Sequence, residues 1–367
     1  MSHKKLSICY IANIRLPTEK AHGVQIMKTC EAFTALGHDV ELVVPNRKTD
    51  ITEDTFSYYG LKTRFSLQRL PVWDTVRYGR IGFFLESFLF AFAVRKHIRA
   101  KTFGMFYGRD ELVLMHLRLP YVWESHTGSW NRAARTVARR AKRIVVISQG
   151  LKDFYIKKGV PAEKISVAHD GVDIEQFAHP QSKNAARTRL NLPHDADIVM
   201  YIGRLDGWKG VATLLETSKN LPNNSVLVVI GGEPAQVAQL SVRYPNVRFL
   251  GFRPYKELAD NMAAANVLVL PNTGTDEIST RFTSPLKLFA YMTSGVPVVA
   301  SDLPSIREVL DEQTAYLVPP DDAVALAEGI QRALVEDSTR ATNALARVAE
   351  YSWKRRAERI VTACSVD

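Results

Sequence analysis

The sequence predicts an α/β protein built from two doubly wound domains, each with a parallel β-sheet covered by helices. Its 367 residues exceed what one ordinary hydrophobic core accommodates. Short apolar runs alternate with segments of helical periodicity in both halves, as repeated βαβ units require. A polar stretch over 179–197 interrupts this alternation. We therefore predict a first domain over 1–185, a second over 186–350 and a final helix over 351–367.

The first half begins with a buried strand and continues through units of strand, loop and helix. After KLSICYIAN (5–13) and a polar loop, apolar residues recur at helical spacing until Gly37, which suits a helix end. The long apolar segment 81–101 predicts a core helix, with a helix lying on a membrane surface as the alternative. Further strands are expected at 40–44, 105–110 and 121–126, and at the start of the segments 143–150 and 164–177. A basic helix is expected over 131–143.

The second half repeats the same rhythm up to a tail, YSWKRRAERIVTAC (351–364), that is basic and amphipathic. Its apolar runs predict strands that begin the segments 197–210, 225–233, 247–252, 266–271, 296–302 and 314–334, with helices between them.

The positive charge is concentrated in the first half. Residues 1–185 hold 29 Lys and Arg against 17 Asp and Glu, whereas residues 186–367 hold 19 against 21. Such asymmetry indicates an anionic substrate, anionic lipid or nucleic acid as a partner of the first half, or only a solubilising surface. We discount nucleic acid because no nucleic-acid-binding module is recognisable.

The cysteines and the hydropathy predict a cytoplasmic protein. Cys9, Cys30 and Cys364 form neither a disulfide framework nor a zinc-binding spacing, which fits a reducing compartment. The first apolar run is too short for a signal peptide, and no run reaches the ~18 residues of a membrane-spanning helix.

The stretch from Pro271 to Leu310 predicts an anion-binding site. It reads as strand, loop, helix and strand, and open parallel sheets bind ligands beyond the carboxyl ends of their strands. Pro285 suits the first turn of the helix because its missing N–H costs nothing there. Thr283 and Ser284 just before it give a helix N-terminus that can hold a phosphate.

Arg204 and Lys209, in the stretch GRLDGWKG, are candidate phosphate ligands. Both follow a predicted strand, where a guanidinium can make bidentate contacts to phosphate and an ammonium supplies a point charge. Two fixed cations stabilise the charge that builds up on a diphosphate as its bond to another group breaks. Such a pair is commonplace on a surface, but beside the hydroxyl-rich helix N-terminus it predicts a diphosphate clamp.

Two residues of the first half are further candidates. Gly23, at a junction between loop and helix, either lets backbone amides approach a ligand or is a plain turn glycine. His126 follows the predicted strand of YVWES, which favours a functional role, although a lone histidine is more often structural. No G-x-G-x-x-G pattern supports a dinucleotide site.

Several motifs together resemble the retaining nucleotide-sugar glycosyltransferases of family 4, which have the two Rossmann-like domains of the GT-B fold facing each other across a cleft. The resemblance covers nearly the whole chain and is weakest in 46–120. The stretches that carry it are VISQGL, VAHDGVDIEQF, GRLDGWKG, TSPLKLFAYMTSGVPVVASDLPSIREVL and YSWKRRAERI.

The resemblance implies a role for each candidate. Arg204 and Lys209, after Gly203, would hold the diphosphate of the donor, and no metal or cofactor is implied. Gly23 would approach the donor phosphate, and His126 would lie beside the transferred sugar. The final helix would cross back to the first domain. Lining residues of the donor pocket would be Ser284, Pro285, Leu286 and Lys287, with Arg253 bordering the nucleobase.

The sequence departs from the family's pair of glutamates eight residues apart. The aligned positions are Phe282 and Ala290, and the second is usually a glutamate that accepts hydrogen bonds from the ribose hydroxyls. Losing such a charged hydrogen bond would cost about 1.5–3 kcal/mol of donor binding. Glu277, in the loop before the helix, could partly substitute. An engineered weakening, a natural variant with altered donor binding and a non-catalytic homologue all remain open.

The function implied is a retaining, metal-independent transfer of a sugar from a nucleotide-diphosphate sugar to a hydroxyl acceptor. We expect an envelope glycan or a lipid-linked precursor as acceptor, reached from the cytoplasm by a protein bound peripherally to the inner face of the membrane. A donor-impaired homologue that only binds or scaffolds is the main alternative, and a sugar-nucleotide epimerase is a less favoured one.

Overall fold

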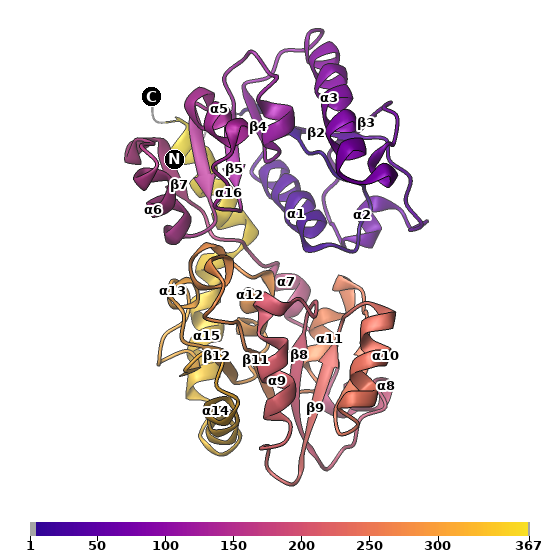
Figure 1. Cartoon of the computed structure of the whole chain (residues 1–367), viewed down its shortest axis with the longest axis vertical. Helices are drawn as coiled ribbons and strands as arrows, with labels where there is room; N and C mark the ends of the chain where they lie inside the picture. The colour runs from indigo at the N-terminus through magenta and orange to yellow at the C-terminus, as the bar shows by residue number, and fades with distance from the viewer. Residues whose placement is uncertain (1–4, 366–367) are drawn as a thin grey trace. The chain divides into compact units, whose positions relative to one another are not determined.

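The computed structural model describes residues 5–365 and divides the chain into two compact α/β units (Figure 1). The first unit contains the described residues up to Ile147, Leu151–His169 and the segment from Trp353 onward. The second contains Ser148–Gly150 and Asp170–Ser352. The chain therefore changes unit at Asp170, some way before the polar stretch, because Val172 and Phe177 already belong to the core of the second unit.

The strands of the first unit form one parallel sheet. They are β1 (Ser7–Ile11), β2 (Asp39–Pro45), β3 (Ser66–Leu70), β4 (Met105–Gly108), β5 (Val122–Ser125), β6 (Arg143–Val146) and β7 (Ile165–Val167). Their order is β3-β2-β1-β4-β5-β6-β7, so the topology reverses direction between β1 and β4. The carboxyl ends of strands at such a switch point are where ligands bind in doubly wound folds.

The helices of the first unit include one from the far end of the chain. They are α1 (Ala21–Ala35), α2 (Thr55–Tyr58), α3 (Gly79–Ile98), α4 (Glu111–Leu114), α5 (Arg132–Arg140), α6 (Gln149–Lys157) and α16 (Trp353–Ser365). α16 packs beside α1 (Figure 1). Arg356 from α16 is buried, so this return of the chain completes the interior of the unit.

α3 has one buried face and one exposed apolar face. Glu86, Phe90 and Val94 are fully buried, and Glu86 forms an ion pair of 2.5 Å with Arg47. The opposite face exposes Ile81, Phe84, Leu85, Phe88 and Phe92, each between 47% and 83% accessible. The favoured prediction of a core helix therefore describes one face only. Among the described residues no helix is long and apolar enough to cross a membrane.

The second unit has the strand order of a Rossmann fold. Its strands are β8 (Asp197–Ile202), β9 (Ser225–Ile230), β10 (Arg248–Gly251), β11 (Val267–Leu270), β12 (Val298–Ser301) and β13 (Tyr316–Val318). They are parallel and ordered β10-β9-β8-β11-β12-β13, so the switch point lies between β8 and β11. Both candidate stretches, 203–210 and 271–287, leave the carboxyl ends of these two strands.

Helices cover both faces of this second sheet. They are α7 (Ile174–Phe177), α8 (Lys183–Arg189), α9 (Val211–Thr217), α10 (Pro234–Arg243), α11 (Leu258–Met262), α12 (Leu286–Met292), α13 (Pro304–Arg307), α14 (Ala323–Val335) and α15 (Thr339–Arg347). Leu214 of α9 and Ile330 of α14 bury one face of the sheet, whereas Met262 of α11 and Phe289 of α12 bury the other. The apolar strands are buried on both sides, as their continuous apolar runs predict.

Candidate active site

The loop after β8 carries the predicted diphosphate clamp. Arg204 is exposed and its guanidinium lies 3.1 Å from the carboxylate of Asp206. Nζ of Lys209 lies 4.7 Å from the ring centroid of Trp208, and burial lowers the pKa of Lys209. The hydroxyl of Tyr201 donates a hydrogen bond of 2.7 Å to the carbonyl oxygen of Arg204 and fixes the start of the loop. Two cations are thus held at the carboxyl end of β8.

Gly210 ends this loop and explains why the motif closes with glycine. It adopts φ +67°, a left-handed conformation that other residues avoid, and immediately precedes α9. A Cβ at this position would lie 1.6 Å from the carbonyl oxygen of Pro271, at the end of β11. The glycine therefore lets the loops that leave β8 and β11 pack directly together, so the two candidate stretches share one edge of the sheet.

Lys287 brings a third cation to this edge from the start of α12. Its Nζ is buried and has no hydrogen-bond partner within residues 5–365, and it lies 3.9 Å from the ring centroid of Tyr201. A Cβ at Gly203 would lie 3.4 Å from the same Nζ. Burial, followed by the charge of Lys209, holds the pKa of Lys287 well below its usual value. A buried amine that has no hydrogen-bond partner among the described residues and feels the charge of Lys209 is the strongest sign of an anion-binding site here.

The residues just before α12 are held in place by contacts of their backbone and hydroxyl groups. Ser284 is buried, and its Oγ accepts a hydrogen bond of 3.0 Å from the backbone N–H of Asp170. Pro285 is extended and precedes Leu286, the first residue of α12, so it caps the helix and does not occupy its first turn as predicted. A short π-helix, Ile278–Phe282, precedes this turn and has no clear signal in the sequence.

Ala290 and Phe282, at the positions of the expected glutamates, are both core residues. Ala290 is 1% exposed and Phe282 is 3% exposed. Ala290 packs in the same apolar cluster as Leu288 and Met292. Glu277 is exposed, as is Arg253 beyond β10, and within the described chain the side chain of neither forms a hydrogen bond or ion pair. Their contacts with a donor stay predictions.

In the first unit, His126 belongs to a buried polar network centred on Glu124. Glu124 is fully buried in β5, and its carboxylate accepts hydrogen bonds from Nε2 of His126 and the hydroxyl of Tyr107. Gln25 of α1 donates to it at 2.5 Å and Arg356 of α16 at 2.7 Å. The network ties together two strands and two helices, and it holds the imidazole in one orientation.

The charges of this network fix the protonation state of His126. Burial alone raises the pKa of Glu124, but the cation of Arg356 and the contact with His126 outweigh it and hold that pKa well below its usual range. Burial and the charge of Arg109 lower the pKa of His126 to about 4, against the opposing pull of Glu124. At neutral pH the imidazole is therefore neutral, its Nε2–H donates to Glu124, and Nδ1 keeps a lone pair that can accept a hydrogen bond.

His126 and Glu124 line a polar cavity of about 210 Å³ at the carboxyl edge of the first sheet. Arg109 also lines it and donates to Gln25 at 2.8 Å. Burial lowers the pKa of His22 to about 4 and raises that of Asp110 to about 6. Several hydrogen-bonding groups facing a small cavity suit a ligand with many hydroxyls.

Gly23 has a packing role. It lies in the first turn of α1, where a Cβ would come within 2.4 Å of the Tyr59 hydroxyl and 2.7 Å of the Thr18 side chain. That hydroxyl accepts from the Thr18 N–H at 2.7 Å and donates to the Thr18 carbonyl at 2.9 Å. The need for a glycine is thus explained without a ligand, and its contact with a donor phosphate stays a prediction.

Sequence reasoning missed Glu124, Arg356 and Arg109. The spacing of Glu124 and His126 was an available signal, because residues i and i+2 of a strand face the same side. Arg356 gave no comparable signal, since it stands among other basic residues in a tail that reads as an exposed amphipathic helix.

Two Rossmann-like parallel units in one chain, the second with cations at its carboxyl edge, define a protein of the GT-B fold class. Solved structures with the same fold include HepE of Anabaena in complex with UDP and glucose, with a TM-score of 0.78, 18% identity and 99% and 100% of the two chains covered. Sucrose-phosphate synthase from Thermosynechococcus elongatus gives a TM-score of 0.75 at 21% identity, covering 96% and 97%. At these identities the likeness concerns the fold alone.

Family models match both halves of the sequence. The model described as Glycosyltransferase Family 4 matches residues 22–176, and the one described as Glycosyl transferases group 1 matches residues 196–336. The chain belongs to glycosyltransferase family 4.

Curated relatives are similar over part of their length. D-inositol 3-phosphate glycosyltransferase 1 of Catenulispora acidiphila is 30% identical over 225 residues, covering 55% of this chain and 52% of that protein. Phosphatidyl-myo-inositol mannosyltransferase of Mycobacterium tuberculosis is 33% identical over 208 residues, covering 52% and 51%. This chain thus matches about half the length of these relatives.

Proposed function

We propose that the protein transfers a sugar from a nucleotide-diphosphate sugar to a hydroxyl group of a glycan or lipid-linked acceptor, with retention of configuration. The observation that carries the proposal is the buried Nζ of Lys287, which has no hydrogen-bond partner in the described chain and lies near Lys209 and Gly203 at the switch point of the second sheet. HepE, which has the same fold, was solved with UDP and glucose, and the curated relatives act on inositol-containing acceptors by name. These relationships favour a nucleotide sugar as the anion.

The chemistry needs little from the protein beyond charge and orientation. Arg204, Lys209 and Lys287 stabilise the negative charge that grows on the diphosphate as its bond to the sugar carbon breaks. The acceptor hydroxyl attacks that carbon from the face the diphosphate leaves, and its proton passes to the departing phosphate oxygen. Retention follows from attack and departure on one face. Nδ1 of neutral His126 accepts a hydrogen bond from a hydroxyl of the transferred sugar.

We propose that the reaction needs no resident metal ion, because three side-chain cations supply the positive charge that a metal would bring to the diphosphate. Turnover that persists undiminished in excess EDTA supports this part of the proposal. A loss of turnover that Mg²⁺ or Mn²⁺ restores contradicts it.

We further propose that the protein works at the cytoplasmic face of an anionic membrane and contacts it through the exposed side of α3. Ile81, Phe84, Leu85, Phe88 and Phe92 recur at helical spacing along this side. Cations lie at both of its ends, and Trp73 and Tyr78 next to the helix are exposed by 78% and 65%. Basic residues around an apolar stripe, with Trp and Tyr beside them, suit a helix lying in the interface of an anionic bilayer. The basic residues concerned are Arg77, Arg80, Lys96 and Arg99.

The proposal is tested by donor binding. Thermal unfolding with UDP, GDP and ADP sugars identifies the nucleotide, and calorimetry then compares the native protein with Arg204→Ala, Lys209→Ala and Lys287→Met. Each lost charged contact is expected to weaken donor binding about tenfold or more. Arg243→Ala, an exposed substitution on α10 of the same unit, serves as control. Unchanged donor binding in all three site variants would remove the diphosphate clamp.

A donor-impaired homologue is the alternative that Ala290 favours, because a buried methyl group cannot accept hydrogen bonds from ribose. If the native protein binds no nucleotide sugar while Ala290→Glu does, the alternative is correct and the transferase activity proposed for the native chain is not.

A further inference from the structure

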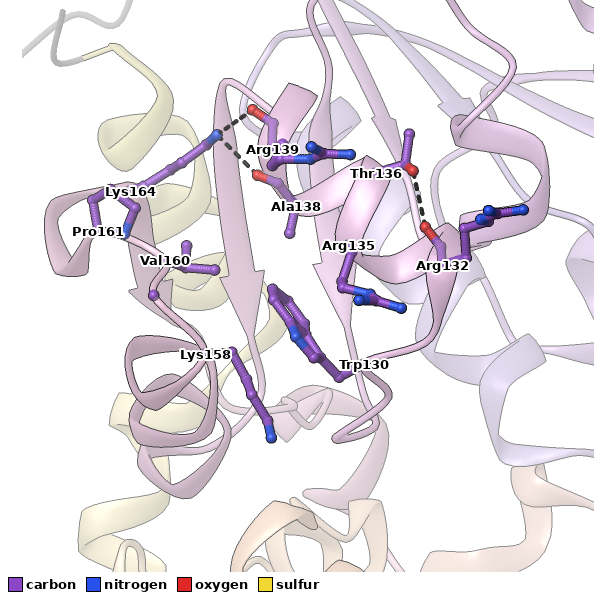
Figure 2. A pocket seen from close by; sticks show the side chains of 11 residues that line it. Trp130, Arg132, Arg135, Thr136, Ala138, Arg139, Lys158, Val160, Pro161 and Lys164 are labelled. Atoms are coloured by element: carbon purple, nitrogen blue, oxygen red, sulfur yellow. Dashed lines mark hydrogen bonds between the residues drawn. The ribbon is translucent and has the colours of Figure 1, made fainter.

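A second hollow of the first unit lies on the side of α5. It has a volume of about 680 Å³ and is bounded by α5 and by the turn that follows α6 (Figure 2). We call it the α5 groove. Its lining residues are Trp130, Arg132, Arg135, Thr136, Ala138, Arg139, Lys158, Gly159, Val160, Pro161 and Lys164.

The α5 groove is lined by cations without acidic partners. Arg132, Arg135 and Arg139 project from successive turns on one side of α5 and are exposed. In the described chain these three and Lys158 form no ion pair, and no acidic residue lines the groove. The fifth cation, Lys164, donates at 2.9 Å to the carbonyls of Ala138 and Arg139 and thereby caps the end of α5. Four cations without ion-pair partners in the described chain, around one hollow, attract a ligand with several negative charges.

The spacing of the arginines excludes a single small anion as the natural ligand. Arg139 lies seven positions after Arg132, which is a rise of ~10 Å along the helix. One phosphate or carboxylate cannot meet both ends of such a row. A ligand that engages the whole row therefore carries at least two anionic groups along an extended chain.

An aromatic side chain forms the floor of the groove. Figure 2 shows the indole of Trp130 between α5 and the segment around Val160. Its ring lies 5.9 Å from that of Tyr155, whose hydroxyl donates at 2.9 Å to the carbonyl oxygen of Thr127. Thr127 also lines the cavity of His126. Tyr155 thus links the floor of the groove to a residue that lines the cavity of His126.

We propose that the α5 groove binds the anionic sugar chain of the acceptor, an oligosaccharide bearing carboxylate or phosphate groups. The arginines and Lys158 contact the anionic groups, and Trp130 offers an apolar face to a sugar ring. That the ligand is a saccharide rests on the proposed function. A membrane fits less well because a planar bilayer does not enter a hollow. Single-stranded nucleic acid fits less well because its sites offer successive aromatic platforms, whereas this groove offers one.

The test measures the binding of defined oligosaccharides by calorimetry. The probes are an oligogalacturonate, a phosphorylated mannooligosaccharide and a neutral maltooligosaccharide of the same length. We expect one or both charged probes to bind at least about tenfold more tightly than the neutral one, with affinity falling as salt rises. Arg135→Ala with Arg139→Ala should weaken the charged probe by about tenfold or more, and Trp130→Ala should weaken it as well.

A matched control removes the same charge elsewhere in the unit. Arg118→Ala with Lys157→Ala alters two exposed cations outside the groove and should leave binding unchanged. The altered side chains of Arg135 and Arg139 are exposed, and circular dichroism verifies that the variants fold. Equal affinity for neutral and charged probes, or equal weakening by the control, overturns the proposal. The proposal is also overturned if inorganic pyrophosphate binds to the groove as tightly as the oligosaccharides do. Binding of only anionic vesicles, or of only a single-stranded oligonucleotide, likewise overturns it.

Donor binding on the same preparation separates this proposal from the proposed function. If nucleotide sugars bind and no oligosaccharide depends on the groove, the groove proposal alone fails. If a charged oligosaccharide depends on the groove and no nucleotide sugar binds, the groove is an anionic-glycan site and the transferase function fails.

Discussion

Arg356 and Glu124 lie 232 residues apart in the sequence and form a buried contact of 2.7 Å between Nη2 and Oε1. Arg356 comes from the helix that ends the described chain, and Glu124 from the strand that leads to His126. Their side chains are 2% and 0% exposed. The carboxylate of Glu124 holds the candidate catalytic imidazole. Its charge is neutralised by Arg356, which reaches the first unit only through the last helix of the described chain.

Removing Arg356 should therefore destabilise the first unit strongly. Arg356→Met leaves the Glu124 carboxylate buried without its cation, and breaking a buried pair from one side costs about 3–5 kcal/mol. Hydrogen exchange of peptides from α1 and β5 measures the loss locally. Arg355→Met is the matched control, because that side chain is 67% exposed on the same helix and should cost less than about 0.5 kcal/mol. The same protection loss in both variants would contradict the role of the pair.

His126 should make the first unit less stable as the pH falls. Its pKa is about 4 in the folded protein against 6.5 for an ordinary histidine, so between these values the unfolded chain binds a proton that the folded chain excludes. The free energy of unfolding then falls by up to about 1.4 kcal/mol per pH unit for each such proton. Glu124 adds no loss above its ordinary pKa of 4.5, because a carboxylate with a depressed pKa loses its stabilisation only below that value.

Hydrogen exchange between about pH 7 and pH 5 measures that slope. His126→Asn should lower this slope by the contribution of about one proton. His22→Asn should lower it by a similar amount, since the pKa of His22 is also about 4. His179→Asn, a histidine of the second unit, is the control. A slope that His126→Asn leaves intact would show that the imidazole is charged in the folded protein.

The sequence predicted the fold more fully than the site. Continuous apolar runs predicted every strand of the two sheets except β3, whose sequence SLQRL is not a continuous apolar run. The stretch GRLDGWKG marked the loop that carries Arg204 and Lys209. The network around Glu124 joins α1, β4, β5 and α16, and no local pattern encodes contacts between such distant segments. α3 was ambiguous for another reason: apolar residues surround the whole helix, so periodicity could not separate its buried face from its exposed face.

The exposed face of α3 should govern binding to anionic vesicles. Phe84→Ser with Phe88→Ser removes two apolar side chains, each worth about 1.5–3 kcal/mol when buried in an apolar medium. Sedimentation with vesicles of rising anionic content should show at least about a tenfold loss. Lys96→Glu with Arg99→Glu should abolish the dependence on anionic lipid, whereas Val242→Ser, at an 85% exposed valine of the second unit, should change nothing. Equal binding of the native protein to neutral and anionic vesicles would remove the membrane proposal.

Ala290→Glu tests whether the missing carboxylate limits donor binding. The structure predicts a cost, because the side chain at 290 is 1% exposed in an apolar cluster and a carboxylate there is partly desolvated. We expect the variant without ligand to lose about 1–3 kcal/mol of stability. If position 290 faces the ribose when donor is bound, the nucleotide sugar should raise the unfolding temperature of the variant by more than it raises that of the native protein.

Ala290→Leu is the control, because it strains the same site and its unfolding temperature should gain nothing extra from the ligand. An equal ligand-induced shift in all three proteins would show that this position does not contact the ribose. The methyl group of Ala290 would then serve only to pack the hydrophobic core.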